Sequence, residues 1–227
     1  MQPSNDFSRS GERGNVFLFI LLGVILFAAL AFAVSRGFRS DTTTAMSQRK
    51  AELLAVDVIA FAQRLERTVA KMQRSGVSEN DISFENPVDA GYAHTPSTDA
   101  YNIFHGDGGA ISRQGAPSGA NDGSAWHYTG HTCIADLGTG ATGCASNTAS
   151  DEELIAVLPN VNATVCGIID KKLGISAIPA NTGTAYAATK FTGTYADGSE
   201  IILDRSRNAA CYSQGGNYYF YHVLIAR

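Results

Sequence analysis

The chain has 227 residues, and its 17 Lys and Arg against 21 Asp and Glu give a formal net charge of −4. This balance, without a basic patch outside the first 75 residues, argues against nucleic acid as a partner. Beyond the first apolar run roughly 190 residues remain, which is enough for one domain with a sizeable core.

The first feature along the chain is an apolar run, Val16–Val34, that contains no charged residue (VFLFILLGVILFAALAFAV). A helix over this run would span roughly 28 Å, close to the ~30 Å hydrocarbon core of a bilayer. The run is therefore predicted to be a transmembrane segment of a single-pass inner-membrane protein.

A second helical segment follows a short polar patch at Ser35–Ser47. Its apolar residues recur at steps of three and four, which places them on one stripe of a helix: Leu54, Val58, Phe61, Leu65, Val69 and Met72. Gly76 is the expected C-cap. The pattern predicts one long helix over residues 15–75, apolar all round in its first half and on one face in its second.

Four cysteines lie after the apolar run: Cys133, Cys144, Cys166 and Cys211. An even number beyond a membrane segment indicates disulfides in an oxidising compartment, and four cysteines allow three connectivities. We favour Cys133–Cys144 and Cys166–Cys211, because the first two flank a short Gly/Thr-rich loop. No C-x2-C pair suggests a zinc site.

The orientation of the predicted anchor follows from the cysteines. Arg9 and Arg13 precede the apolar run, and Arg36 and Arg39 follow it, so the positive-inside rule does not assign an orientation. Disulfides place the bulk of the chain in the periplasm and the N-terminus in the cytoplasm.

Residues 76–150 are dense with turn dipeptides and predict an irregular lobe with short strands at Tyr101–Phe104, Ala110–Ser112 and Trp126–Tyr128. Trp126 is expected to anchor the lobe to the core. Gly106–Gly109 resembles a phosphate loop but lacks the Gly-Lys-Ser/Thr ending, so a tight turn is predicted.

Metal and cofactor sites are not predicted. His127 and His131 have the spacing of helical metal ligands, but turn residues surround them. Asp99, Asp107 and Asp122 could offer calcium ligands from loops, but they lack the EF-hand spacing.

The last third, residues 151–227, is predicted to hold helices and a sheet. Ser150–Glu153 has the letters of a capping box for a helix over Leu154–Leu158, and a second helix is predicted over Asn160–Leu173. Two hairpins are expected, one from Lys190–Tyr195 and Glu200–Asp204, the other from Ala209–Tyr212 and Tyr218–Ile225.

The fold class expected from these elements is α+β. A meander of about four antiparallel strands would pack on the stripe of the long helix, with the last strand in a central position because both its faces are apolar. His222 within that strand is expected to be buried and hydrogen-bonded. No catalytic motif is present, so an enzyme is not predicted.

The N-terminal region resembles a type IV prepilin or pseudopilin. The resemblance rests on a short hydrophilic leader (residues 1–14), then about twenty apolar residues, then an amphipathic helix. It implies cleavage by a prepilin peptidase between Gly14 and Asn15. The fifth mature position, usually glutamate in the family, is Phe19 here, and a cut after Gly11 would place Val16 there.

The resemblance also implies a function and partners. The chain would be a structural, pilin-like subunit of a type IV pilus or a type II secretion-like pseudopilus, as a major or minor subunit, with other pilin-like subunits, the inner membrane and the prepilin peptidase as partners. Two alternatives remain open: a membrane-anchored envelope module that binds through its Gly-rich lobe, and a secretory signal cleaved at Ala31-Phe32-Ala33.

Overall fold

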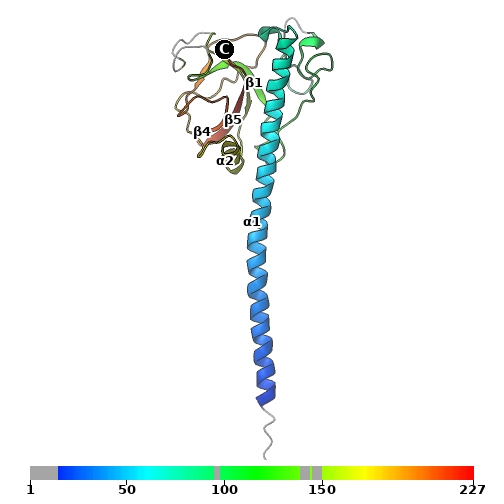
Figure 1. Ribbon diagram of the computed structural model, residues 1–227, viewed down its shortest axis with the longest axis vertical. Coiled ribbons are helices and arrows are strands. Elements are labelled where there is room, and N and C mark those ends of the chain that lie inside the picture. The colour runs from blue at the N-terminus through cyan, green and yellow to red at the C-terminus, as the bar shows by residue number, and fades with distance from the viewer. Residues whose placement is uncertain (1–14, 95–97, 139–143, 145–149) are drawn as a thin grey trace, which may run out of the picture. The chain divides into compact units, whose positions relative to one another are not determined.

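The computed structural model describes residues 15–94, 98–138, 144 and 150–227, and the side chains of residues 15–16 and 33–46 are outside that description. The chain divides into two compact units, Met1–Arg49 and Lys50–Arg227. Figure 1 shows the chain as a ribbon and labels several of its helices and strands.

Helix α1 runs over Asn15–Arg74. It ends as the sequence predicts, with Gly76 in the left-handed region at φ 93°. The Val77 N–H donates to the Met72 carbonyl at 3.1 Å, and the Gly76 N–H donates to the Gln73 carbonyl at 2.9 Å. These bonds satisfy carbonyl groups at the end of the helix that have no acceptor role within it. They require a positive φ at residue 76, which glycine adopts readily.

Across the described residues, we find no helix stretch that is both long and apolar enough to cross a membrane. The predicted transmembrane segment over residues 16–34 and the inner-membrane localisation are therefore wrong on this finding.

The second unit contains one mixed sheet of five strands in the order β3-β1-β2-β5-β4. The strands are β1 (His127–Ile134), β2 (Glu153–Leu158), β3 (Ser199–Ile201), β4 (Ala209–Gln214) and β5 (Asn217–Ile225). All neighbours are antiparallel except β1 and β3, which pair in parallel from Thr132↔Ser199 to Ile134↔Ile201.

The predicted fold class is therefore wrong in two respects. The sheet is mixed and five-stranded, where an antiparallel meander of about four strands was expected. The long N-terminal helix was also expected to pack on the sheet as a single element, and this is wrong. The chain divides into two units after Arg49. Only the part of α1 from Ala51 to Met72 enters the core of the second unit.

The sheet is buried on both faces, and the alternation along β2 shows this directly. Leu154, Ala156 and Leu158 belong to the larger core, which includes α1 and α2. Ile155 and Val157 point to the opposite face and join a second core with residues such as Tyr212 and Tyr221. A strand covered on both sides needs apolar residues at every position.

The predicted helix over Leu154–Leu158 is thus wrong, because these residues form the middle strand β2. The capping-box letters before it, Asp151 to Glu153, are buried at the start of the strand instead of capping a helix. A five-residue apolar run fits a buried strand as well as a helix turn, and here pairing with β1 and β5 decides between them.

Helix α2 covers Ala163–Lys172, within the predicted range of residues 160–173. Its N-cap is Asn162, whose side chain accepts a hydrogen bond from the Thr164 N–H at 2.9 Å. Its buried residues, among them Val165, Cys166 and Ile169, lie in the same core as α1.

One of the two predicted hairpins is confirmed. Strands β4 and β5 pair from Ala209↔His222 to Gln214↔Asn217 around Gly215 and Gly216, which both have positive φ. The other is wrong, since β3 pairs in parallel with β1, and residues 190–195 lie outside the regular strands. Strand β5 is interior to the sheet, as its apolar faces predict.

The lobe between α1 and β1 contains two short 3-10 helices, Glu79–Asp81 and Asp99–Tyr101. The expected strand at residues 101–104 is not formed, and residues 110–112 also lie outside the regular strands. Trp126 anchors the lobe, as predicted: its ring lies 5.4 Å from that of Phe61 on α1 and 6.1 Å from that of Phe220 on β5.

Both predicted disulfides are present, Cys133–Cys144 and Cys166–Cys211. The first closes a separation of 11 residues next to β1, and the second joins α2 to β4 across 45 residues. All four cysteines are therefore bridged.

Candidate functional site

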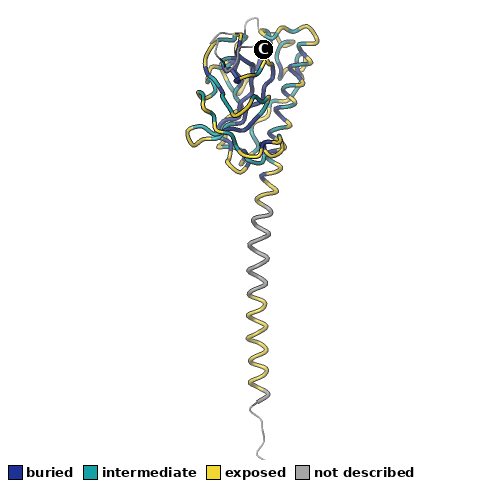
Figure 2. Tube along the Cα trace, turned by 60° about the vertical axis from the view of Figure 1, so that its left-hand side comes forward, coloured by how far each residue is buried: buried dark blue, intermediate teal, exposed yellow. Residues whose placement is uncertain are grey.

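The most unusual surface in the described chain is the apolar part of α1 in the first unit, residues 17–32. Its large apolar side chains are 50% to 74% exposed, with Leu22 at the lower limit and Phe27 at the upper. Figure 2 shows this stretch in the colour of exposed residues. A helix that is apolar on every side normally lies in a protein core or another water-poor environment. This segment therefore lacks the cover that its composition requires.

The predicted processing site begins just before this segment. Gly14 lies outside the described residues, and Asn15 is the first residue of α1. Phe19, at the fifth position after the predicted cut, is one of the exposed apolar side chains, at 63%.

The predicted helix stripe lies in the second unit and is buried there. Val58, Leu65 and Val69 are fully buried, and Phe61 and Met72 are each 3% exposed. Leu54 is partly buried and packs against the same core. These side chains hold α1 to the sheet within its own unit and leave the opposite side of the helix exposed.

That opposite side carries seven exposed residues at steps of three and four, which place them on one line along the helix. We call this set the outer face of α1: Leu53, Val56, Ala60, Arg64, Arg67, Lys71 and Arg74. The first three are apolar, with Leu53 at 66% and Val56 at 45% exposure, and the last four are cations. Sequence analysis did not single out this face.

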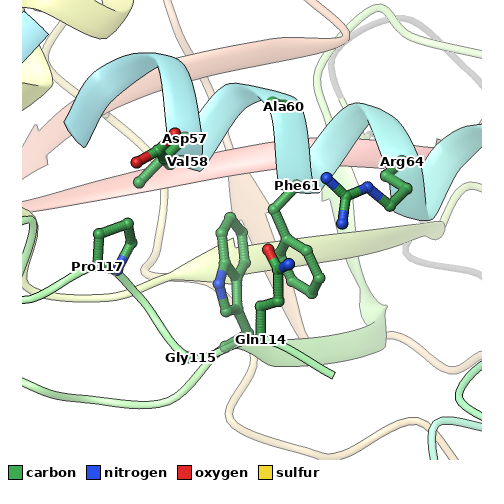
Figure 3. Close-up of a pocket in the computed structure, with 9 residues that line it drawn as sticks. Asp57, Val58, Ala60, Phe61, Arg64, Gln114, Gly115 and Pro117 are labelled. Atoms are coloured by element: carbon green, nitrogen blue, oxygen red, sulfur yellow. The ribbon is translucent and has the colours of Figure 1, made fainter. Parts of the chain in front are cut away.

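A shallow cavity of about 310 Å³ lies between α1 and the loop at residues 114–117 (Figure 3). Asp57 and Arg64 line it, together with the rings of Phe61 and Trp126. Both aromatic side chains are almost fully buried, at 3% and 4% exposure. They belong to the core, and the cavity offers a ligand little aromatic surface.

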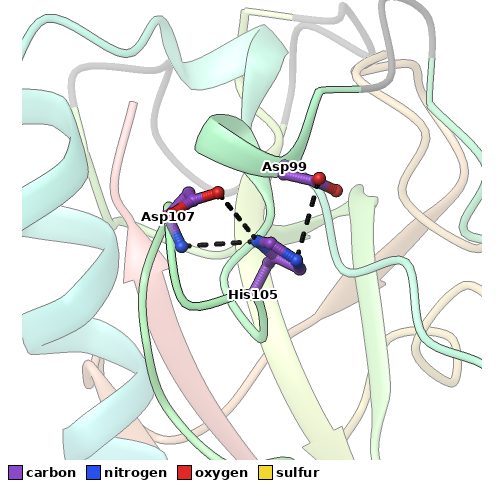
Figure 4. Close-up of side chains that lie close together, drawn as sticks. All are labelled: Asp99, His105 and Asp107. Carbon is purple, nitrogen blue, oxygen red and sulfur yellow. Dashed lines mark hydrogen bonds and ion pairs between the residues drawn. The ribbon is translucent and has the colours of Figure 1, made fainter.

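Asp99, His105 and Asp107 form the cluster closest to a metal-binding arrangement among the described residues (Figure 4). His105 Nε2 lies 3.7 Å from Asp99 Oδ2, and His105 Nδ1 lies 3.8 Å from Asp107 Oδ2. The Asp107 N–H donates to His105 Nδ1 at 3.3 Å, so that nitrogen is an acceptor.

This geometry fits a metal poorly. A histidine that binds a metal through one ring nitrogen usually donates the N–H of the other. Here the second nitrogen, Nδ1, instead accepts a hydrogen bond from the backbone. The cluster is better explained as an ordered loop tip with two exposed carboxylates, Asp99 at 71% and Asp107 at 78%.

The remaining histidines that sequence analysis considered are separated in the fold. His127 and His131 both lie on β1, where four residues rise about 13 Å, too far for one ion. Burial lowers the pKa of both. His222 is buried and hydrogen-bonded as predicted, with Nε2 2.8 Å from Glu66 Oε2 on α1.

Buried carboxyl groups form a further feature that the sequence did not reveal. Glu152 and Glu153 are 2% and 0% exposed, and Glu153 Oε2 accepts a hydrogen bond from the Ile134 N–H at 2.6 Å. Burial raises the pKa of Glu152 to about 8, and the nearby Asp197 carboxylate contributes to this rise. Burial also raises the pKa of Glu153 to about 8.

Asp170 on α2 is a third group of this kind, at 1% exposure. Its Oδ1 accepts a hydrogen bond from the Cys211 N–H at 2.9 Å, next to the disulfide between α2 and β4. Burial raises its pKa to about 7. Glu153 and Asp170 therefore connect elements of the core through these bonds.

Comparison with family models, with curated proteins and with solved structures finds no significant match to the chain. Any function must therefore be inferred from its own surfaces.

Proposed function

We propose that the chain is a structural, pilin-like subunit that assembles into a filament through residues 17–32 of α1. The observation that carries the proposal is the exposure of this apolar segment on every side. Copies of the same segment, packed side by side, would provide the water-poor cover that it lacks.

The energetics favour such assembly. Twelve large apolar side chains between Phe17 and Phe32 are exposed. Full burial of one such side chain stabilises by roughly 1.5–3 kcal/mol, whereas association costs about 4–15 kcal/mol in lost freedom. Because these side chains are 50% to 74% exposed, burial of most of the twelve is needed to offset that cost. The helix also satisfies its own backbone hydrogen bonds, so it can be buried without unpaired polar groups.

The leader before Asn15 gives a second line of support, because its resemblance to a prepilin leader implies cleavage before assembly. The compact second unit, with its two disulfides, would then be the folded domain of the subunit.

A sedimentation experiment tests the proposal. The full chain is purified in mild detergent, the detergent is removed, and the pelleted fraction is examined by electron microscopy. Parent chain should pellet as filaments, and Phe27→Asp should stay in the supernatant. Val88→Asp is the matched control, since Val88 and Phe27 are both 74% exposed. A parent that stays monomeric, or equal behaviour of the two variants, would contradict the proposal.

A further inference from the structure

The outer face of α1 in the second unit carries a strong local charge. Arg64, Arg67, Lys71 and Arg74 are all exposed and lie on one line over three helical turns. Within the described residues, none of these four side chains has a carboxylate within 4 Å. Glu66, the one acid in this part of the helix, is bound to His222. The four cations therefore form an uncompensated basic stripe.

The lobe that follows carries the opposite charge. Residues 77–136 contain eight acidic side chains against one arginine, Arg113. Several acids are already in use, such as Asp89 with Lys190 and Glu79 with Arg227. Asp99 and Asp107 are different, because they lie at a loop tip and are 71% and 78% exposed. We call these two residues the acidic loop tip.

The basic stripe and the acidic loop tip do not neutralise each other within one chain. The loop lies close against α1. If Gly109 carried a Cβ atom, that atom would lie 2.7 Å from Thr68 Cγ2 on the helix. Among the described residues, Asp99 and Asp107 have ion-pair partners only in His105. Both charged patches are thus left facing outward on a single subunit.

We propose that the basic stripe of one copy binds the acidic loop tip of the next copy. Two different patches of the same chain then meet in a head-to-tail contact, which produces a ring or an open helical filament. This inference rests on the proposed filament function and names a second contact for it. The exposed apolar residues Leu53 and Val56, on the same outer face, would extend the contact beyond the charges.

The chemistry of the contact predicts its properties. Guanidinium groups bind carboxylates with two parallel hydrogen bonds, which gives the contact a defined orientation. Exposed charges are screened beyond about 8 Å at physiological ionic strength, so assembly through this contact should weaken as salt rises. Like charges that face each other across an interface disfavour it, so reversal of either patch should be harmful.

Charge exchange on the full chain tests the inference. Arg67→Glu with Lys71→Glu reverses the stripe, and Asp99→Lys with Asp107→Lys reverses the loop tip. Each pair alone should raise the protein concentration at which pelleting begins by about tenfold or more. The combined fourfold variant keeps the net charge of the parent and should recover assembly to within about twofold.

The matched control is Lys171→Glu with Arg205→Glu, which reverses two exposed cations outside the outer face and should behave as the parent. Fluorescence of Trp126, buried beside Phe61, verifies that every variant is folded. An assembling parent whose charge-reversed variants assemble equally well, or a folded fourfold variant that does not recover, would overturn the inference and leave the proposed function intact.

Two further outcomes are informative. A parent that does not assemble would overturn both proposals. In the second outcome, both charge reversals leave assembly unaffected, and a fluorescent polyanion, such as a single-stranded oligonucleotide, binds the parent but not the stripe variant. The basic stripe would then bind a polyanion, and the contact between copies would be rejected.

Discussion

His222 Nε2 on β5 lies 2.8 Å from Glu66 Oε2 on α1, and this bond ties the helix to an interior strand of the sheet. His222 is 6% exposed, so loss of its partner leaves a buried ring nitrogen without this bond. Glu66→Ala should lower the free energy of unfolding by about 1–2 kcal/mol.

Urea unfolding followed by the fluorescence of the single tryptophan, Trp126, measures this change. Glu52→Ala, at an exposed position on the same helix, is the control and should have almost no effect. Equal stability of Glu66→Ala and the parent would show that the bond contributes nothing to the core.

The buried stripe of α1 gives a larger expected effect. Leu65 is 0% exposed and lies in the main core, so Leu65→Asp places an unpaired charge among apolar side chains. The cost should exceed about 4 kcal/mol and unfold the second unit. Circular dichroism measures the outcome. Leu53→Asp makes the same change at 66% exposure and should leave the fold intact.

The two disulfides should differ in what they contribute. Loss of Cys166–Cys211, by alanine at both positions, should cost about 1 kcal/mol more than loss of Cys133–Cys144, because it closes 45 residues against 11. Each should lie within about 2–5 kcal/mol. Urea unfolding of both double variants checks the order, and a reversed order would contradict the loop-entropy explanation.

The buried carboxyl groups predict how stability depends on pH. Glu152 and Glu153 have pKa values raised to about 8, so between about pH 4.5 and 8 the native state holds protons that the unfolded chain has released. Stability is therefore greatest at the acidic end of this window and falls as the pH rises, by up to about 1.4 kcal/mol per pH unit for each group.

Urea midpoints measured from pH 5 to pH 8 test this dependence. Glu152→Gln, which mimics the protonated side chain, should flatten the profile, while Glu52→Gln at an exposed position should not. A protein that becomes more stable as the pH rises across this window would be inconsistent with neutral carboxyl groups at the start of β2.

The leader makes a separate prediction about processing. In cells that naturally make the chain, intact mass and N-terminal sequencing should give a first residue at Asn15. Gly14→Leu should block the cut and leave the full leader in place. A mature chain that begins at Met1 or at Val34 would contradict the resemblance to a prepilin.

The elements that sequence analysis predicted correctly are those whose signal is local. The amphipathic part of α1, the cap at Gly76 and the hairpin of β4 and β5 each depend on residues close together in the chain. The disulfide pairing was also local in origin, since a short loop favoured Cys133–Cys144.

The errors concern features that depend on distant partners. The run before Pro159 fits a helix turn or a buried strand equally well, and only its pairing with β1 and β5 makes it β2. The parallel pairing of β3 with β1 joins Thr132 to Ser199 and leaves no local trace. Glu153 pairs with Thr132 on β1, so its burial at the start of β2 also depends on a distant strand and was equally hidden.

The candidate surfaces were predictable only in part. The apolar composition of residues 17–32 is plain in the sequence, but composition alone fits a bilayer and a bundle of helices equally well. The outer face of α1 follows the same three-and-four spacing as the buried stripe, so a search for charged residues at that spacing would have found it.

The central claim is that residues 17–32 of different copies lie together in the assembled state. A nitroxide attached at Leu22→Cys tests this directly, because all four native cysteines are bridged and only the introduced thiol reacts. We expect strong spin–spin coupling between copies, which disappears when labelled chains are diluted with unlabelled parent. Assembled material in which each label remains isolated and mobile in water would contradict the account.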